Sequence, residues 1–412
     1  MLRFWFAIPL WQRVVGALIL GVITGMLWGP GAESIRWMGD LFIRAIRMLV
    51  VPLIFFSVVA GVASIGDLRK LGAVGWRALL LFVVTGQIAV WMGIGLGVLF
   101  APGSNVDTSA IERGPTPEPV EVTAVEMLLS VIPENPVEVM ATAQVLPLIV
   151  FALLLGIGIV MAKEEGLPVA RIFDSGAVVM QKVTIIVMEL TPFGVFALMA
   201  WVAGTLGQDA LIALAGLVAL NYAGCLAIIF IVYVGIVRVL AKLPIIAFFR
   251  GMADAIVVAY STASSNASLP VTLRCTQRNL GVSRSTSSFV VSLGATINMD
   301  GTAMYLGLAT IFGAQIFGVE LVFGDYLMIA LLSTLGAIGA AGIPGAGLIM
   351  MALVFSAVSV PLETIAFVAG VDRIMDMMRT ATNVTGDGAV TVAVAEMIGE
   401  IDEEEMVSAD DV

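Results

Sequence analysis

Residues 372–387 read DRIMDMMRTATNVTGD, which places ionisable and amide side chains inside an otherwise apolar part of the chain. Asp372, Asp376, Arg379, Asn383 and Asp387 recur every three or four residues, the spacing of one face of an α-helix. If that helix lies in a membrane, each buried charge costs about 2.5–3.5 kcal/mol on insertion scales. The stretch therefore predicts a buried helix that carries a polar pathway or a binding site.

The premise of a membrane comes from the composition. Of the 412 residues, 60% are hydrophobic and 12% are charged, and the mean hydropathy is +1.06, far from the values of soluble proteins. We therefore predict a polytopic integral membrane protein. Apolar runs long enough to span a bilayer lie near residues 10–29, 42–65, 76–100, 144–162, 176–204 and 210–240.

The net charge of −11 does not indicate a nucleic-acid partner, because the acidic residues concentrate in two segments. The loop 101–142 and the tail 400–412 hold seven acids each. Basic residues mark alternate connections between the apolar runs, so the positive-inside rule predicts cytoplasmic termini and an extracytoplasmic loop 101–142. The chain has no histidine, which excludes a Ser/His hydrolase mechanism.

Two apolar stretches in the second half are each broken by small residues and proline. STASSNASLP (261–270) interrupts residues 244–275, and GAAGIPGAG (339–347) interrupts residues 326–362. The pieces on either side are too short to cross about 30 Å of hydrocarbon, so each stretch is predicted to form a pair of half-helices. Paired interrupted segments point to a transporter binding site between inverted repeats. For the second stretch, the alternative is one spanning helix and a glycine-rich turn.

Between these stretches lies the polar sequence NMDGT (298–302). It predicts an unwound turn whose oxygen atoms can hold a hard cation such as sodium, and a simple helix kink is the alternative. Asp376 and Arg379 can neutralise each other as an i, i+3 pair, whereas Asp300 and Asp387 have no basic residue nearby in the sequence. Two unpaired carboxylates at membrane depth require bound cations or protons.

Arg379 and Asp376 also suggest the chemistry of a solute. A planar guanidinium group suits a carboxylate, and an aspartate can accept an ammonium group. An amino acid with an acidic side chain satisfies both. The alternative is a purely structural ion pair between the two side chains.

Four segments resemble, in the right order, the signature segments of the glutamate transporter family of sodium:dicarboxylate symporters. These are SSNASLPVT (264–272), GATINMDGTAMY (294–305), AAGIPGAG (340–347) and DMMRTATNVTGD (376–387). The resemblance covers nearly the whole chain. It implies an all-α fold of eight transmembrane helices plus two re-entrant helical hairpins, arranged as inverted repeats and assembled as a homotrimer.

The resemblance further implies a fixed scaffold and a transport domain that moves like an elevator. The scaffold would comprise residues 1–67 and 143–208. The transport domain would comprise helix 3 (68–100), helix 6 (209–242) and a core of hairpin 1, helix 7, hairpin 2 and helix 8 (243–399). The segment 400–412 would be an acidic cytoplasmic tail.

By the same resemblance, Arg379 would bind the side-chain carboxylate of the substrate and Asp376 its amino group. The implied pocket is completed by Thr380, Asn383, Thr302, Ser265, Ile343 and Gly347. Two to three sodium ions per protomer are implied. The first would use Asp387, Asn383, Asn298 and the carbonyl of Gly294, the second carbonyls near Thr296, Met299, Ala337, Ile338 and Ala340, and the third Asp300, Asn298 and Thr85.

The chain departs from the family at the third sodium site. A tyrosine and a second hydroxyl on helix 3 are replaced here by Phe82 and Gly86, so the sequence does not decide whether that site binds sodium. Arg373 could take the place of an arginine that some relatives carry at the tip of the first hairpin, where this chain has Ala263.

These observations predict a secondary active transporter and not an enzyme. We expect sodium-coupled symport of L-aspartate or L-glutamate across a prokaryotic inner membrane, with membrane lipid and two further copies of the chain as partners. A proton-coupled or C4-dicarboxylate symporter of the same fold is the alternative. Asp376 argues against a C4-dicarboxylate, which has no ammonium group for it to bind. An ion channel is the alternative from another functional class.

Overall fold

The computed structural model describes residues 8–63, 74–104, 106, 129, 132–142, 144–339, 342 and 344–402. These residues are almost entirely helical, and the one extended pairing among them is an isolated bridge between Val282 and Ile401. The helices in chain order are α2 (Leu10–Trp28), η1 (Gly29–Ile35), α3 (Arg36–Ala63), α4 (Trp76–Phe100), α6 (Pro136–Ala141), α7 (Val145–Met161), η3 (Lys163–Gly166), α8 (Leu167–Met188), α9 (Thr191–Trp201), η4 (Val202–Leu206), α10 (Gly207–Ala227), η5 (Ile228–Tyr233), η6 (Ile236–Leu240), α11 (Ile245–Thr262), α12 (Ser265–Arg274), η7 (Cys275–Asn279), α13 (Arg284–Ile297), α14 (Asp300–Phe317), α15 (Phe323–Gly339), α16 (Ala346–Ala357) and α17 (Glu363–Ile398).

Four helical stretches within the described residues are long and apolar enough to cross a membrane, namely Leu10–Ala63, Trp76–Phe100, Thr191–Leu240 and Ile245–Thr262. The prediction of an integral membrane protein with several spanning helices is therefore confirmed. Shorter apolar helices cover Val150–Met161, Phe323–Ile338 and Ala346–Ala357.

The apolar run 176–204, predicted as one span, is divided in the structure. Helix α8 ends at Met188 and α9 begins at Thr191. Pro192 occupies the first turn of α9, where its missing N–H is tolerated, whereas in a continuous helix it would leave the Met188 carbonyl without its partner. Proline thus ends the predicted span early.

The first group of helices consists of α2, α3, α7, α8 and α9, which pack mainly against one another. Glycines allow α2 to approach α9 closely, because a Cβ added at Gly21 or Gly25 would lie 2.5 Å from the Phe196 carbonyl oxygen or 2.2 Å from that of Ala200. Small residues four apart are a common device for packing helices in membranes. Arg13 on α2 also pairs with Glu189, at 2.6 Å, in the turn between α8 and α9.

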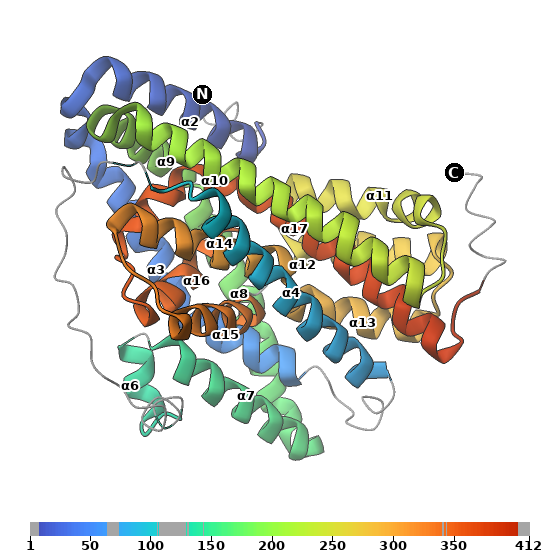
Figure 1. The fold of residues 1–412 in the computed structure, drawn as a ribbon. Helices are drawn as coiled ribbons and strands as arrows, with labels where there is room; N and C mark the ends of the chain where they lie inside the picture. The colour runs from blue at the N-terminus through green and yellow to red at the C-terminus, as the bar shows by residue number, and fades with distance from the viewer. Residues whose placement is uncertain are drawn as a thin grey trace.

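The second group surrounds α17, which contacts α10, α11, α13 and α14 and runs diagonally through the molecule beside α10 (Figure 1). Helix α14 packs against α4, and all of its residues except Gln315 are buried. A helix that is buried on every side occupies the core of its fold. The polar residues of the stripe on α17, which packs against α14, are buried as well, so protein encloses the stripe.

Both predicted broken segments form pairs of helices. The prediction that both pieces of 244–275 are too short to span is wrong for α11, which has 18 residues and is long and apolar enough to cross a membrane. The first, α11 and α12, breaks only at Ala263–Ser264, which is narrower than the predicted 261–270 because Ser264 caps α12 through the Ala267 N–H. The second, α15 and α16, breaks between Gly339 and Ala346. The two breaks meet, since the carbonyl of Gly342 accepts hydrogen bonds from Ser264 Oγ at 2.9 Å and from the Asn266 N–H at 3.2 Å.

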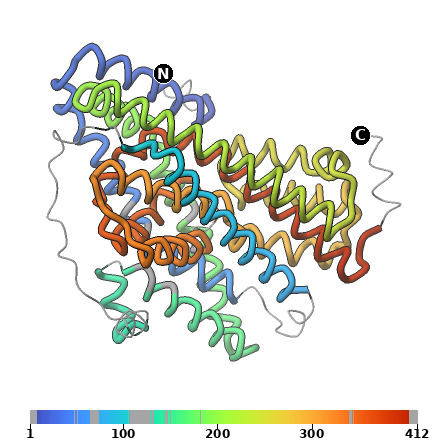
Figure 2. Tube along the Cα trace, in the orientation of Figure 1, coloured from blue at the N-terminus to red at the C-terminus, as the bar shows by residue number. Residues whose placement is uncertain are grey.

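The end of α17 is tied to the start of α13 at one end of the molecule (Figure 2). The Glu400 side chain accepts hydrogen bonds from the hydroxyls of Ser283 and Thr286, both at 2.5 Å. The Glu400 carbonyl accepts from the Ser283 N–H at 3.1 Å, and Asp402 N–H donates to the Gly281 carbonyl at 2.8 Å. The two hydroxyl donors lower the pKa of Glu400 below its usual value.

We predict that Glu400→Gln lowers the melting temperature, because the charged acceptor of two hydrogen bonds is lost, at a cost of roughly 0.5–1.5 kcal/mol. Since the folded protein holds the Glu400 pKa below its ordinary value of 4.5, the stabilisation is present above that pH and lost as the pH falls through the folded-state pKa. Melting curves at neutral and acidic pH, with Glu320→Gln as an exposed control, measure it. An unchanged difference between wild type and Glu400→Gln at pH 3 would contradict the assignment.

Candidate functional site

The polar stripe predicted from residues 372–387 lies on one helix, α17, as expected. All of its ionisable and amide side chains are buried. Arg379 is the most enclosed, with 0% of its surface exposed, and Asp387 follows at 1%. Groups that are charged and shielded from water need partners within the protein or in a ligand.

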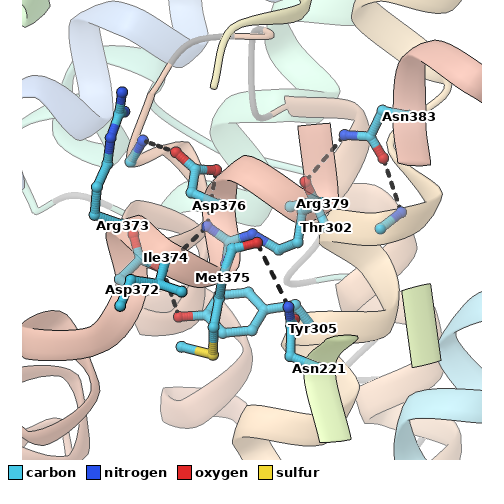
Figure 3. Close-up of polar contacts among 12 residues, drawn as sticks. Asn221, Thr302, Tyr305, Asp372, Arg373, Ile374, Met375, Asp376, Arg379 and Asn383 are labelled. Atoms are coloured by element: carbon cyan, nitrogen blue, oxygen red, sulfur yellow. Dashed lines mark hydrogen bonds and ion pairs between the residues drawn. The ribbon is translucent and has the colours of Figure 1, made fainter. Parts of the chain in front are cut away.

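Arg379 lies at the centre of an ion-pair network. Its Nη2 atom donates to Asp372 Oδ1 at 3.0 Å and to Asp376 Oδ1 at 2.8 Å. The guanidinium group stacks on the ring of Tyr305, 3.7 Å from the ring centroid, and the Tyr305 hydroxyl donates to Asp372 Oδ1 at 2.7 Å. Figure 3 shows these side chains converging from α14 and α17. Asp372, which the sequence left without a role, therefore orients Arg379.

Two donor atoms of Arg379 are not used by this network. Nε and Nη1 are buried and have no hydrogen-bond partner among the described residues. Gly347, in the first turn of α16, lies against Nη1, because a Cβ added there would be 2.8 Å from that atom. The guanidinium group thus keeps unused N–H donors on two nitrogen atoms, one of them beside a small residue, and a carboxylate can accept from such donors.

Asp376 faces the tip of the second helix pair. Its Oδ2 atom accepts a hydrogen bond from the backbone N–H of Gly345 at 2.9 Å, while Oδ1 binds Arg379. Gly345 has φ +77°, a conformation that side-chain-bearing residues rarely adopt. The carboxylate is therefore shared between a fixed arginine and a backbone turn that contacts α17.

Arg373 points to the first helix pair and away from Arg379 (Figure 3). Its Nη2 atom donates to the carbonyl of Thr262 at 3.2 Å, immediately before Ala263 at the break between α11 and α12. Nε and Nη1 of Arg373 have no partner among the described residues. The proximity agrees with the idea that Arg373 supplies a positive charge at this tip.

A cluster of oxygen atoms surrounds Asp387. Asn298 Nδ2 donates to Asp387 Oδ1 and to the carbonyl of Asn383, both at 2.9 Å. Gly294 lies against the same carboxylate, because a Cβ added there would be 2.4 Å from Asp387 Oδ1. Asn298 Oδ1 is buried without a hydrogen-bond partner in the described part of the chain. An unpartnered buried oxygen beside a carboxylate fits a cation ligand, so these residues suit the predicted first sodium site.

The turn predicted at residues 298–302 is present but shorter, because α13 ends at Ile297 and α14 already begins at Asp300. Only Asn298 and Met299 lie outside the helices, and residues 300–302 form the start of α14. Asp300 Oδ2 accepts a hydrogen bond from the hydroxyl of Tyr233 at 2.8 Å. Thr85 is buried, and its hydroxyl donates to the carbonyl of Phe82 at 3.2 Å. Tyr233 lies on η5, so its hydroxyl reaches Asp300 from a different helix than the one that carries Phe82 and Gly86.

A small cavity of about 10 Å³ adjoins Asp300, close to the volume of one water-sized sphere. Predicted ligands of the second and third cations line it together. Its wall includes Phe82, Gly86, Met299, Asp300, Ala337 and Ile338. The tip of the second helix pair thus approaches the turn between α13 and α14, as the second predicted cation site requires.

Asn383 joins the two halves of the candidate site. Its Oδ1 atom accepts from the Gly301 N–H at 2.8 Å, and its Nδ2 atom lies 3.5 Å from Thr302 Oγ1 and 3.2 Å from Met299 Sδ. Asn383 lies on α17, the helix that holds Arg379. Its amide therefore connects α17 with the unwound turn and with the start of α14.

Some predicted site residues make no such contact. Thr380 and Ser265 are buried, but no hydrogen bond within the described residues connects their side chains to the network around Arg379. The Thr296 hydroxyl donates to the carbonyl of Leu293. Ile343 and Ala340 lie outside the described residues.

The sequence did not identify Tyr233, Tyr305 or the backbone of Gly345 as members of the site. Tyr305 stands in the quoted segment GATINMDGTAMY and could have been found from its helical register, because it follows Thr302 by three residues and so shares a helix face with it. Tyr233 is 67 residues from Asp300 in the chain, and nothing in the local pattern of η5 connects it with that carboxylate.

The buried charges of the core do not balance. Within the described residues, Arg373 and Arg379 offset Asp372 and Asp376, while Asp300 and Asp387 pair with no basic side chain. No group of three or more cysteine, aspartate and glutamate side chains suited to a metal ion occurs in the described part. The arrangement can accept an anion at Arg379 and monovalent cations at the two unpaired carboxylates.

Comparison with known proteins agrees with this chemistry. The model of the sodium:dicarboxylate symporter family matches residues 10–397. The chain is 34% identical to a proton/sodium-glutamate symport protein of Geobacillus stearothermophilus over 96% of this chain and 95% of the relative. It is 35% identical to a proton/glutamate-aspartate symporter of Escherichia coli (93% and 92%) and 33% identical to a C4-dicarboxylate transport protein of Bacillus subtilis (96% and 95%).

Proposed function

The chain belongs to the sodium:dicarboxylate symporter family, whose members are membrane transporters and not enzymes, and on this premise we propose that it imports acidic amino acids by sodium symport. The observation that carries the proposal is that two donor nitrogens of Arg379, Nε and Nη1, are unused beside the carboxylate of Asp376. L-aspartate or L-glutamate offers a side-chain carboxylate to these donors and an ammonium group to Asp376.

The rival substrate is a C4-dicarboxylate, because four relatives of similar identity carry that name. Its second carboxylate would have to face Asp376, which already accepts from Arg379 and from the Gly345 N–H. Two carboxylates in contact repel each other unless one takes up a proton. An ammonium group at this position is attracted instead, so the amino acid is favoured.

Charge neutrality supports coupling to several cations. The buried core carries two uncompensated carboxylates, Asp300 and Asp387, and an acidic amino acid adds one further negative charge. Moving an uncompensated charge through a low-dielectric layer is costly. Three monovalent cations would neutralise the loaded core, which is the upper figure that the family resemblance implies.

Sodium is favoured over protons by the ligands. Asn298 Oδ1, which has no hydrogen-bond partner, and the carbonyl groups of the unwound turn are neutral oxygen atoms that a cation can share. A sodium ion can bind several such oxygen atoms at once, whereas a proton on Asp387 supplies a single O–H donor. Three relatives are named for both proton and sodium symport, so proton coupling is the alternative to test.

The packing supports an elevator-type movement. Helices α2, α3, α7, α8 and α9 would form the fixed scaffold and the trimer contacts, and the bundle around α17 would form the transport domain. The pairs α11/α12 and α15/α16 would be re-entrant hairpins that close the site from opposite sides, giving eight transmembrane helices plus two hairpins. Their contact through Gly342 supports a closed site. We place the protein in a prokaryotic inner membrane with cytoplasmic termini.

Uptake into proteoliposomes tests the proposed function. We expect labelled L-aspartate to accumulate when sodium is higher outside, with no accumulation when a pH gradient is imposed without sodium. Potassium and valinomycin should hold the membrane potential constant in both cases. Accumulation of labelled succinate with the same sodium dependence, or aspartate uptake driven by the pH gradient alone, would contradict the proposal.

Arg379→Ala should lower the affinity for L-aspartate by about 2–5 kcal/mol, or roughly 30-fold to several thousand-fold, because a buried charge-assisted contact is lost. Neutral amino acids should lose less. Arg379→Lys, which keeps the charge opposite Asp372 and Asp376 but not the planar fork, separates loss of binding from loss of folding. Isothermal titration measures both variants, and an unchanged aspartate affinity in Arg379→Ala would rule out the assigned role.

A further inference from the structure

Three arginine side chains far from α17's polar stripe line one hollow on the surface of the protein. The hollow has a volume of about 350 Å³ and is bordered by Arg274, Arg278 and Arg284. It lies between the α12–η7 segment and α13, at the end of the molecule where α17 ends (Figure 2). All three side chains are exposed.

The spacing of these residues directs them into the same hollow. Arg274 and Arg278 are four residues apart on the α12–η7 segment, with Gln277 between them. Arg284 and Ser288 are four residues apart on α13. Residues four apart share one face of a helix, and α12 and α13 are in direct contact. Two polar helix faces therefore meet across the turn.

Most of this positive charge is not neutralised. Arg274 pairs with Asp254 at 2.6 Å, but Arg278 and Arg284 form no ion pair with the described residues. No acidic side chain lines the hollow. Glu400 binds the hydroxyls of Ser283 and Thr286 at the start of α13, but it does not line the hollow. The start of α13 adds the positive end of a helix dipole.

We propose that this hollow binds the phosphate group of an anionic phospholipid. Guanidinium groups bind phosphate through paired N–H donors, and basic pockets at the cytoplasmic ends of transmembrane helices suit lipid headgroups. The same wall carries the apolar residues Pro270 and Leu273, which can contact the glycerol and first acyl carbons of a lipid. Free phosphate has no group to place against them, so the lipid is the favoured source.

The hollow belongs to the same group of helices as the candidate site. The hollow is built on α12 and α13, which belong to the bundle around α17 and not to the group of α2, α3, α7, α8 and α9. A lipid held there is attached to the bundle that carries the candidate site. The inference does not depend on which solute that site transports.

Binding of fluorescent phosphatidylglycerol to the purified full-length protein tests the proposal. We compare wild type with Arg278→Gln/Arg284→Gln and with Arg238→Gln/Arg250→Gln, which removes two exposed arginines near the same end but outside the hollow. The first variant should lose about tenfold or more in affinity and the second about twofold or less. Phosphatidylcholine should bind equally weakly to all three proteins, and similar melting curves would show that the variants fold.

Competition separates the two sources of phosphate. Inorganic phosphate at millimolar concentration should not displace phosphatidylglycerol from wild type. Displacement at that concentration would assign the hollow to a soluble phosphate ligand and overturn the proposal. Equal phosphatidylglycerol affinities for the two double variants would also overturn it, because the effect would then be one of overall charge.

Discussion

The charged side chains at the centre of this structure are arranged around one guanidinium group that has no access to water. Arg379 is fully buried, and it can stay charged there because two aspartates and the face of Tyr305 surround it. Both carboxylates use the same nitrogen, Nη2, so the donors on Nε and Nη1 stay available to an anion. Helices α14, α16 and α17 together enclose this group, through Tyr305, Gly347 and the two aspartates.

The breaks between α11 and α12 and between α15 and α16 bring backbone polar groups close to these charges. A continuous helix satisfies its own backbone groups, whereas a break exposes N–H and C=O groups to a ligand. In this structure the Gly345 N–H binds Asp376, and the carbonyl of Gly342 joins the two tips. Glycine is required at both positions, with φ values of +77° and +59°. Each break thus places backbone polar groups beside the charged stripe.

The sequence predicted the placement of the polar groups better than their contacts. The register of residues 372–387 was sufficient to place the polar groups on one face of α17, because helical periodicity is local. The break at Asn298–Met299 was predicted for the same reason, from Asn, Asp and Gly side by side. Tyr233 could not be found, since its contact with Asp300 depends on the packing of η5 against α17. The division of the run 176–204 was missed because hydropathy does not register the backbone effect of Pro192.

The central claim is that the two unpaired carboxylates, Asp300 and Asp387, couple the solute to cations. Isothermal titration of the purified protein with L-aspartate at a series of sodium concentrations and fixed ionic strength tests it most directly. Linkage predicts that the affinity rises with at least the square of the sodium concentration, at constant pH. An affinity that does not change with sodium, or that changes only with pH, would contradict the account.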